Sequence, residues 1–175
     1  IPKIPPLTGN PAVIVEEPVN AVTVLVQWHG PSVRADEVST FVADVYSDVL
    51  NNPQSRFQKK LVDSGLWQAI GVNYYTLNNV GPISVSGQVA PERLRDAVRL
   101  LFAELKATLE PGYFVAEELA ATKANRAVTT EFGMEKSSEF AHTLGFWWSV
   151  SGPDYYWKYI DEMARRNATD LQRYA

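Results

Sequence analysis

Two periodicities divide this sequence into strand-like and helix-like stretches. Apolar side chains fall at every second position in residues 22–28, 69–74 and 83–89, as they do in strands buried on one face. In residues 83–89 the opposite face is polar, a pattern typical of an antiparallel sheet that is covered on one side and open on the other. We therefore expect helices on one face of the sheet only.

Residues 38–50 change to the spacing of a helix. Apolar side chains recur three and four positions apart, which places them in a single stripe. They are Val38, Phe41, Val42, Val45, Tyr46, Val49 and Leu50. The Asn-Asn-Pro run at residues 51–53 ends this helix.

A second, shorter helix is expected from Arg56. Ser55 and Gln58 have the spacing of a capping box, in which each side chain bonds to the backbone N–H of the other residue. Gly65 lies where a left-handed glycine commonly ends a helix. The sequence thus predicts a capped helix, a glycine stop and then the strand at residues 69–74.

Further helices are expected in the second half of the chain. Pro91 suits the first turn of one helix, and Pro153 opens another. Between them a long, mainly helical stretch begins near Val115, with Gly133 and Gly145 as breaks or kinks. Strand pairs separated by helices predict an α+β fold with a mainly antiparallel β-sheet and helices packed on one face.

The N-terminal residues predict a linker followed by a strand. Residues 1–11 are rich in proline and are interpreted as a linker, and residues 12–175 are expected to form one domain of ordinary size. The apolar run at residues 12–16 predicts a short strand, joined as a hairpin to residues 22–28 through Pro18 and Asn20.

Composition excludes several classes of function. With 46% hydrophobic and 21% charged residues, the chain has the values of a globular domain. The net charge of −4 argues against nucleic-acid binding, which requires clustered lysine and arginine. The chain has no cysteine, which excludes disulfides and thiolate zinc ligands. No apolar run reaches the roughly 20 residues of a membrane span.

Short sequence words along nearly the whole chain carry a family resemblance. They are Gly30-Pro31-Ser32, Ser55-Arg56-Phe57 with Leu61, Gly65 and Leu66, Pro91-Glu92-Arg93-Leu94, Glu117-Glu118-Leu119, Asp154-Tyr155-Tyr156 and Thr169-Asp170-Leu171-Gln172. In order and spacing they resemble the C-terminal, non-catalytic half-domains of the pitrilysin/insulinase family of zinc metallopeptidases, of the mitochondrial processing peptidase-like type.

The resemblance implies a half-domain of a larger zinc metalloendopeptidase. Paired half-domains of the family form a clamshell around an extended peptide, so the expected role is part of the wall and an interdomain interface. The expected partners are a zinc-bearing sibling domain or subunit and a peptide or protein substrate, with no nucleic acid and no membrane span. In the family another strand follows the final helix, so a chain ending at Ala175 is expected to lack its last strand. Bacterial members favour the periplasm, and the cytoplasm stays open.

Two departures from the family pattern predict no catalytic, cofactor-binding or metal-binding residue in this chain. The catalytic domains carry His-x-x-Glu-His, in which both imidazoles bind zinc and the glutamate is the base. The only histidines, His29 and His142, do not fit this motif. Active partner domains also place an Arg and a Tyr that hold the substrate carbonyl, and these positions fall on Val62 and Gln68. The resemblance therefore implies zinc in the sibling domain, and Arg56 is interpreted as structural.

Some polar and aromatic residues have two interpretations. Glu117 and Glu118 suit the positive end of a helix dipole better than catalysis. Thr169 is expected to cap the last helix. A group of aromatic side chains belongs either to the core or to an interface with a sibling domain. This group is Phe146, Trp147, Trp148, Tyr155, Tyr156, Trp157 and Tyr159.

Two functions stay open at this point. The first is the non-catalytic domain of a zinc metalloendopeptidase, so that the chain alone is no enzyme. The alternative is a catalytically dead structural, assembly or peptide-binding module on the same fold, which the core subunits of respiratory complexes also resemble. The presence of a zinc-bearing sibling separates the two.

Overall fold

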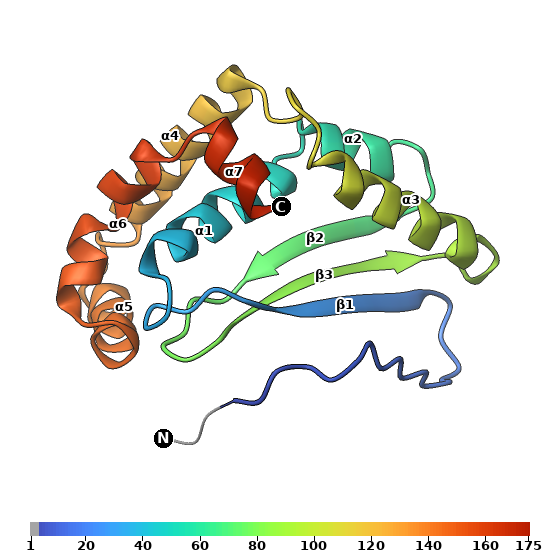
Figure 1. Ribbon diagram of the computed structural model, residues 1–175, viewed down its shortest axis with the longest axis horizontal. Coiled ribbons are helices and arrows are strands. Elements are labelled where there is room, and N and C mark those ends of the chain that lie inside the picture. The colour runs from blue at the N-terminus through green and yellow to red at the C-terminus, as the bar shows by residue number, and fades with distance from the viewer. Residues whose placement is uncertain (1–3) are drawn as a thin grey trace.

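Three antiparallel strands form one sheet, and the helices are layered over one side of it (Figure 1). The computed structural model describes residues 4–175. The strands are β1 (Val22–Gly30), β2 (Ala69–Tyr74) and β3 (Gly81–Val89), in the order β1-β3-β2. The predicted α+β fold with an antiparallel sheet is confirmed.

Seven α-helices and one short 3₁₀ turn complete the described chain. They are α1 (Glu37–Asn51), α2 (Arg56–Leu61), the turn Pro91–Arg93, α3 (Leu94–Ala107), α4 (Ala116–Phe132), α5 (Ser137–Val150), α6 (Pro153–Arg165) and α7 (Ala168–Tyr174). Helix α1 packs against β2 and also against α4, α6 and α7. Because it is covered on both sides, α1 contributes Phe41, Val45 and Leu50 to the fully buried core.

Only one of the two hydrogen bonds of the predicted capping box forms at the start of α2. The Ser55 hydroxyl accepts a hydrogen bond from the Gln58 N–H at 3.1 Å, as expected for an N-cap. The Gln58 side chain does not return to Ser55; it donates to the carbonyls of Leu50 and Ile70 instead. Gly65 has φ +72°, so the left-handed glycine after this helix is confirmed.

Two helix-end predictions are wrong. Gly145 does not break α5, because it is exposed and open space surrounds it, and a helix tolerates one glycine at a cost of about 1 kcal/mol. Gly133, in contrast, is the C-cap of α4, as predicted. The cap of α7 is Asn167 and not Thr169: the Asn167 side chain accepts from the N–H groups of Thr169 and Asp170.

The N-terminal hairpin predicted from sequence is also wrong for this structure. Residues 12–16 are exposed and belong to no strand, and within residues 4–175 the sheet ladder contains only β1, β2 and β3. Residues 22–28 form β1, which pairs with β3. Their alternating pattern therefore does not require a second partner at residues 12–16. Of the predicted linker, residues 4–11 are exposed and form no helix or strand, and residues 1–3 lie outside the described residues.

Candidate functional site

A row of polar side chains crosses the buried side of α1. Thr40, Asp44 and Asp48 are four positions apart, and this spacing places them on one side of the helix. The Thr40 hydroxyl lies 2.7 Å from the hydroxyl of Tyr155 on α6. The Thr76 hydroxyl, from the loop after β2, donates to Asp44 at 3.4 Å. This row therefore joins α1 to α6 and to the β2–β3 loop.

Asp44 is the most perturbed acid of this row. Burial raises the pKa of its carboxyl from 3.8 to about 7, although the Arg126 guanidinium acts in the opposite direction. Tyr159 also lies against this carboxyl, and burial together with the charge of Asp44 raises the pKa of Tyr159 well above 10. Asp44 is consequently close to half-protonated at neutral pH, in a place that is nearly closed to solvent.

Asp48 and Arg126 line a polar hollow between α1 and α4. The Arg126 Nε donates to Asp48 Oδ2 at 2.7 Å, and Nη2 donates to Oδ1, which makes a bidentate pair. The hollow has a volume of about 330 Å³. Its other lining residues are Asn51, Asn52, Pro53, Thr122, Asn125 and Thr129. Asp48, the carboxylate in this lining, is already paired with Arg126. The other polar groups of the lining are amides and hydroxyls, which can make hydrogen bonds but are not general bases.

Arg56 makes contacts of a structural kind. Its Nε lies 3.3 Å from the buried carboxylate of Glu104 on α3, and its guanidinium covers the Tyr113 ring at 4.7 Å. The Tyr113 hydroxyl donates to the same carboxylate at 2.8 Å, so Arg56 and Tyr113 together hold Glu104. Arg56 thereby ties α2 to α3.

Val62 and Gln68, where the family resemblance led us to expect the positions of the substrate-holding Arg and Tyr, differ in exposure. Val62 is half-buried against the core just after α2, where it has no polar group to offer. Gln68 is exposed, and its backbone N–H donates to the Gln88 carbonyl at 2.9 Å.

The two histidines are on different elements and are both exposed. His29 is near the end of β1, and His142 is on α5 beside Ser138, Glu139 and Thr143. Within residues 4–175, no cluster of three His, Cys, Asp or Glu side chains could hold a metal ion.

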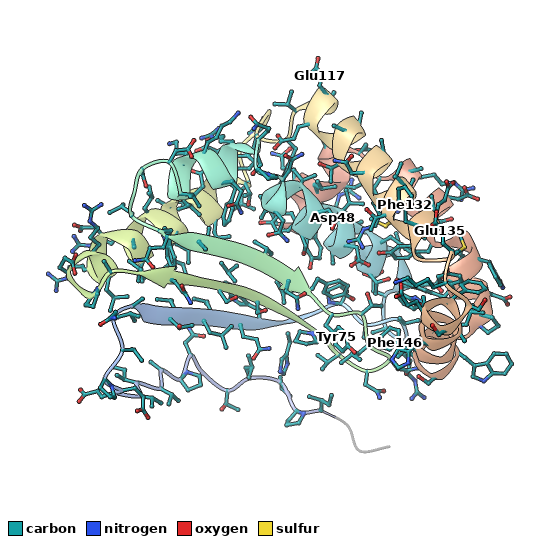
Figure 2. All side chains as sticks on the ribbon, turned by 180° about the vertical axis from the view of Figure 1, so that it is seen from behind. Asp48, Tyr75, Glu117, Phe132, Glu135 and Phe146 are labelled. Atoms are coloured by element: carbon teal, nitrogen blue, oxygen red, sulfur yellow. The ribbon has the colours of Figure 1, made fainter. Side chains whose placement is uncertain are left out.

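The aromatic group divides between core and surface. Tyr155 is buried and stacks on Phe41 with ring centroids 4.6 Å apart, whereas Trp148 and Trp157 are exposed. Figure 2 shows Tyr75 and Phe146 where the loop after β2 meets α5, and their ring centroids are 5.7 Å apart. Part of this group therefore belongs to the core and part of it is exposed on the surface.

A comparison with protein-family models identifies the chain. The model described as the peptidase M16 inactive domain matches residues 1–126. The match covers more than half of the chain, and the chain therefore belongs to the peptidase M16 inactive-domain family. This confirms the sequence resemblance to non-catalytic domains of the pitrilysin/insulinase type. A comparison with curated proteins found no match.

Solved structures show the same fold at low sequence identity. A protease from Helicobacter pylori has a TM-score of 0.80 and 20% identity, over 93% of this chain and 39% of that one. An inactive peptidase domain from Bordetella parapertussis has a TM-score of 0.77 and 17% identity, over 92% and 87%. The periplasmic protease PqqL from Escherichia coli has a TM-score of 0.69 and 13% identity, over 95% and 19%. The chain thus spans less than half of two of these proteins and most of the third.

Proposed function

We propose that this chain is the non-catalytic half of a two-part zinc metallopeptidase, with zinc and catalysis supplied by a sibling domain or subunit. The observation that carries the proposal is membership of the M16 inactive-domain family. The Helicobacter protease, of which a similar fold makes up 39%, supports the idea of a larger peptidase. The chain would form one wall around a peptide substrate, and residues 12–175 would be a single half-domain.

The exposed aromatic side chains support a covered surface in that assembly. Trp148 and Trp157 each leave most of their ring area in water, and aromatic residues are enriched where proteins meet. A sibling domain packed on the α5–α6 side would bury them.

The compartment proposed is the bacterial periplasm. The fold similarity to PqqL, a periplasmic protease, supports it. No helix within residues 4–175 is long and apolar enough to cross a membrane. Fractionation of the native host would test this assignment: recovery in the cytoplasmic fraction alone would contradict it.

Metal analysis of the purified 175-residue chain tests the catalytic part of the proposal. We expect substoichiometric zinc after dialysis and no cleavage of unstructured peptides, because His29 and His142 lie on separate elements. Addition of zinc should produce neither stoichiometric zinc binding nor peptide cleavage. About one tightly held zinc per chain, removable by a chelator, would show a metal centre in this chain. That result would contradict the proposal that zinc is bound only by a sibling domain or subunit.

A further inference from the structure

Charge is unevenly distributed along this acidic chain. Residues 56–107, from the start of α2 to the end of α3, carry seven basic and four acidic side chains, a net charge of +3. The remaining residues carry nine basic and sixteen acidic side chains, a net charge of −7. Regions of opposite charge on two copies of a protein attract each other, and salt screens this attraction.

The outer face of α3 is basic and partly apolar. Its exposed side chains recur at intervals of four, three and four residues, so they form one row along the helix. They are Arg95, Arg99, Phe102 and Lys106. Phe102 is 49% exposed, and the ion pair of Arg99 with Asp96 at 3.8 Å lies in water. Because exposed pairs of this kind contribute little, the row stays open to a partner.

The outer face of α4 is acidic at both ends and apolar between them. Its exposed row consists of Glu117, Ala121, Ala124, Val128 and Glu131. Figure 2 shows Glu117 projecting from the start of this helix. Val128 is 51% exposed, and the two alanines leave room for a large side chain between the acids. At 1.5 Å per residue, the row of α3 is about 17 Å long and the row of α4 about 21 Å.

The two rows are complementary when the helices are placed antiparallel. With Phe102 opposite Ala124, the large ring of one row faces the small side chain of the other, as knobs face holes in helix packing. Arg95 and Glu131 each lie seven residues from this centre, so they meet at one end of the contact. Antiparallel helices also bring opposite ends of their dipoles together.

At the other end of the contact, Lys106 comes beside Glu117. Their positions differ by three residues along the helix axis, or about 4.5 Å, which the long lysine side chain spans. The two faces of one chain do not meet each other, because both are exposed and they lie at different places in the helical layer. In Figure 1, α3 lies beside α2, and α4 lies with α1 and α6. The complementary face must therefore come from another copy.

We propose that copies of this chain associate through these two faces, with α3 of one copy packed antiparallel on α4 of the next. The contact joins unlike faces, so each added copy presents both faces again unless the assembly closes as a ring. This inference goes beyond the proposed peptidase role and does not depend on it. It also leaves Trp148 and Trp157 on the α5–α6 side uncovered.

Sedimentation velocity of the 175-residue chain over a hundredfold range of concentration tests the contact. We expect species larger than the monomer, whose share grows with protein concentration and falls when NaCl is raised from about 50 mM to about 500 mM. Arg95→Glu and Glu131→Arg should each weaken association about tenfold, because each places like charges opposite each other. The double variant exchanges the two charges and should associate within about threefold of wild type.

Two further variants test the specificity of the contact. Arg34→Glu is the matched control, because it makes the same change of net charge at an exposed position outside both faces. It should associate as wild type does. Phe102→Ala removes the central ring and should weaken association about tenfold at any salt concentration. All these positions are exposed, so circular dichroism should show an unchanged fold.

Three outcomes would overturn the proposal. A chain that stays monomeric at every concentration would show that the faces do not bind each other. A double variant as weak as Arg95→Glu alone would show that Arg95 and Glu131 do not meet. A monomer that binds phosphatidylglycerol vesicles, and loses this binding in Arg95→Glu, would assign the basic row to a lipid surface instead.

Discussion

Replacement of Asp44 by asparagine should make the chain more stable at pH 8, by on the order of 2–4 kcal/mol. At this pH the native chain must hold a charged carboxylate in a buried place. Burial raises the pKa of that group from 3.8 to about 7. Asparagine has the same shape without a charge to desolvate, and it can still accept a hydrogen bond from Thr76.

The direction of the pH dependence follows from the raised pKa. The folded chain binds the Asp44 proton more tightly than the unfolded chain, in which the group titrates near 3.8. The contribution of Asp44 to stability is therefore greatest below about pH 4 and is lost as the pH rises towards 7. The loss continues through pH 7 and is complete about one pH unit above it. The charged or titratable groups that interact electrostatically with this carboxyl are Arg126, Asp48, Tyr159, Tyr74, Tyr155 and Tyr174.

Urea denaturation of wild type and variant between pH 4 and pH 8 measures the effect. The difference in unfolding free energy should grow with pH through 7 and level off near pH 8. Asp48→Asn is the matched control, because this acid is paired with Arg126, and its loss should destabilise the chain. An Asp44→Asn variant that is less stable than wild type at pH 8 would show that the charge is well stabilised where it lies.

Replacement of Trp67 by alanine should lower the unfolding free energy by about 3–5 kcal/mol. Trp67 lies between α2 and β2 with 2% of its surface exposed. Its ring packs so closely on Gly87 that a Cβ there would lie 2.7 Å from it. Its indole N–H donates to the Ala97 carbonyl on α3 at 3.1 Å. The alanine variant thus leaves a large cavity and removes this hydrogen bond as well.

Two control variants separate these contributions. Trp67→Phe keeps most of the ring and removes the hydrogen bond, so it should cost roughly 1–2 kcal/mol. Trp148→Ala removes a tryptophan that is 72% exposed and should change stability by less than about 0.5 kcal/mol in the isolated chain. Equal effects of the Trp67 and Trp148 truncations would contradict the placement of Trp67 at the centre of the core.

The sequence predicted the elements whose signal is local. The stripe at residues 38–50 became α1, and the alternation at residues 83–89 became β3, because burial on one face imposes these periods. The hairpin at residues 12–16 failed because a strand also needs a ladder partner, which no local pattern guarantees. The cap at Asn167 was missed because Asn and Thr are both good caps, and the choice depends on where the helix begins.

The polar groups inside the fold were harder to predict. Asp44 was not predicted as buried, because the helix was assigned from its apolar stripe alone. The four-residue spacing of Thr40, Asp44 and Asp48 was nevertheless a usable signal. The contact of Arg56 with Glu104 joins residues on α2 and α3 that are far apart in sequence. Such a pair becomes visible only when the helices are packed.

Mass spectrometric sequencing of the intact native polypeptide, together with any subunit that co-purifies with it, tests the central claim most directly. We expect a His-x-x-Glu-His segment in the same polypeptide or in a stably bound partner, with about one zinc per assembly. Absence of this segment from both would contradict the role as the inert half of a zinc peptidase. The chain would then be a structural or peptide-binding module on the M16 fold.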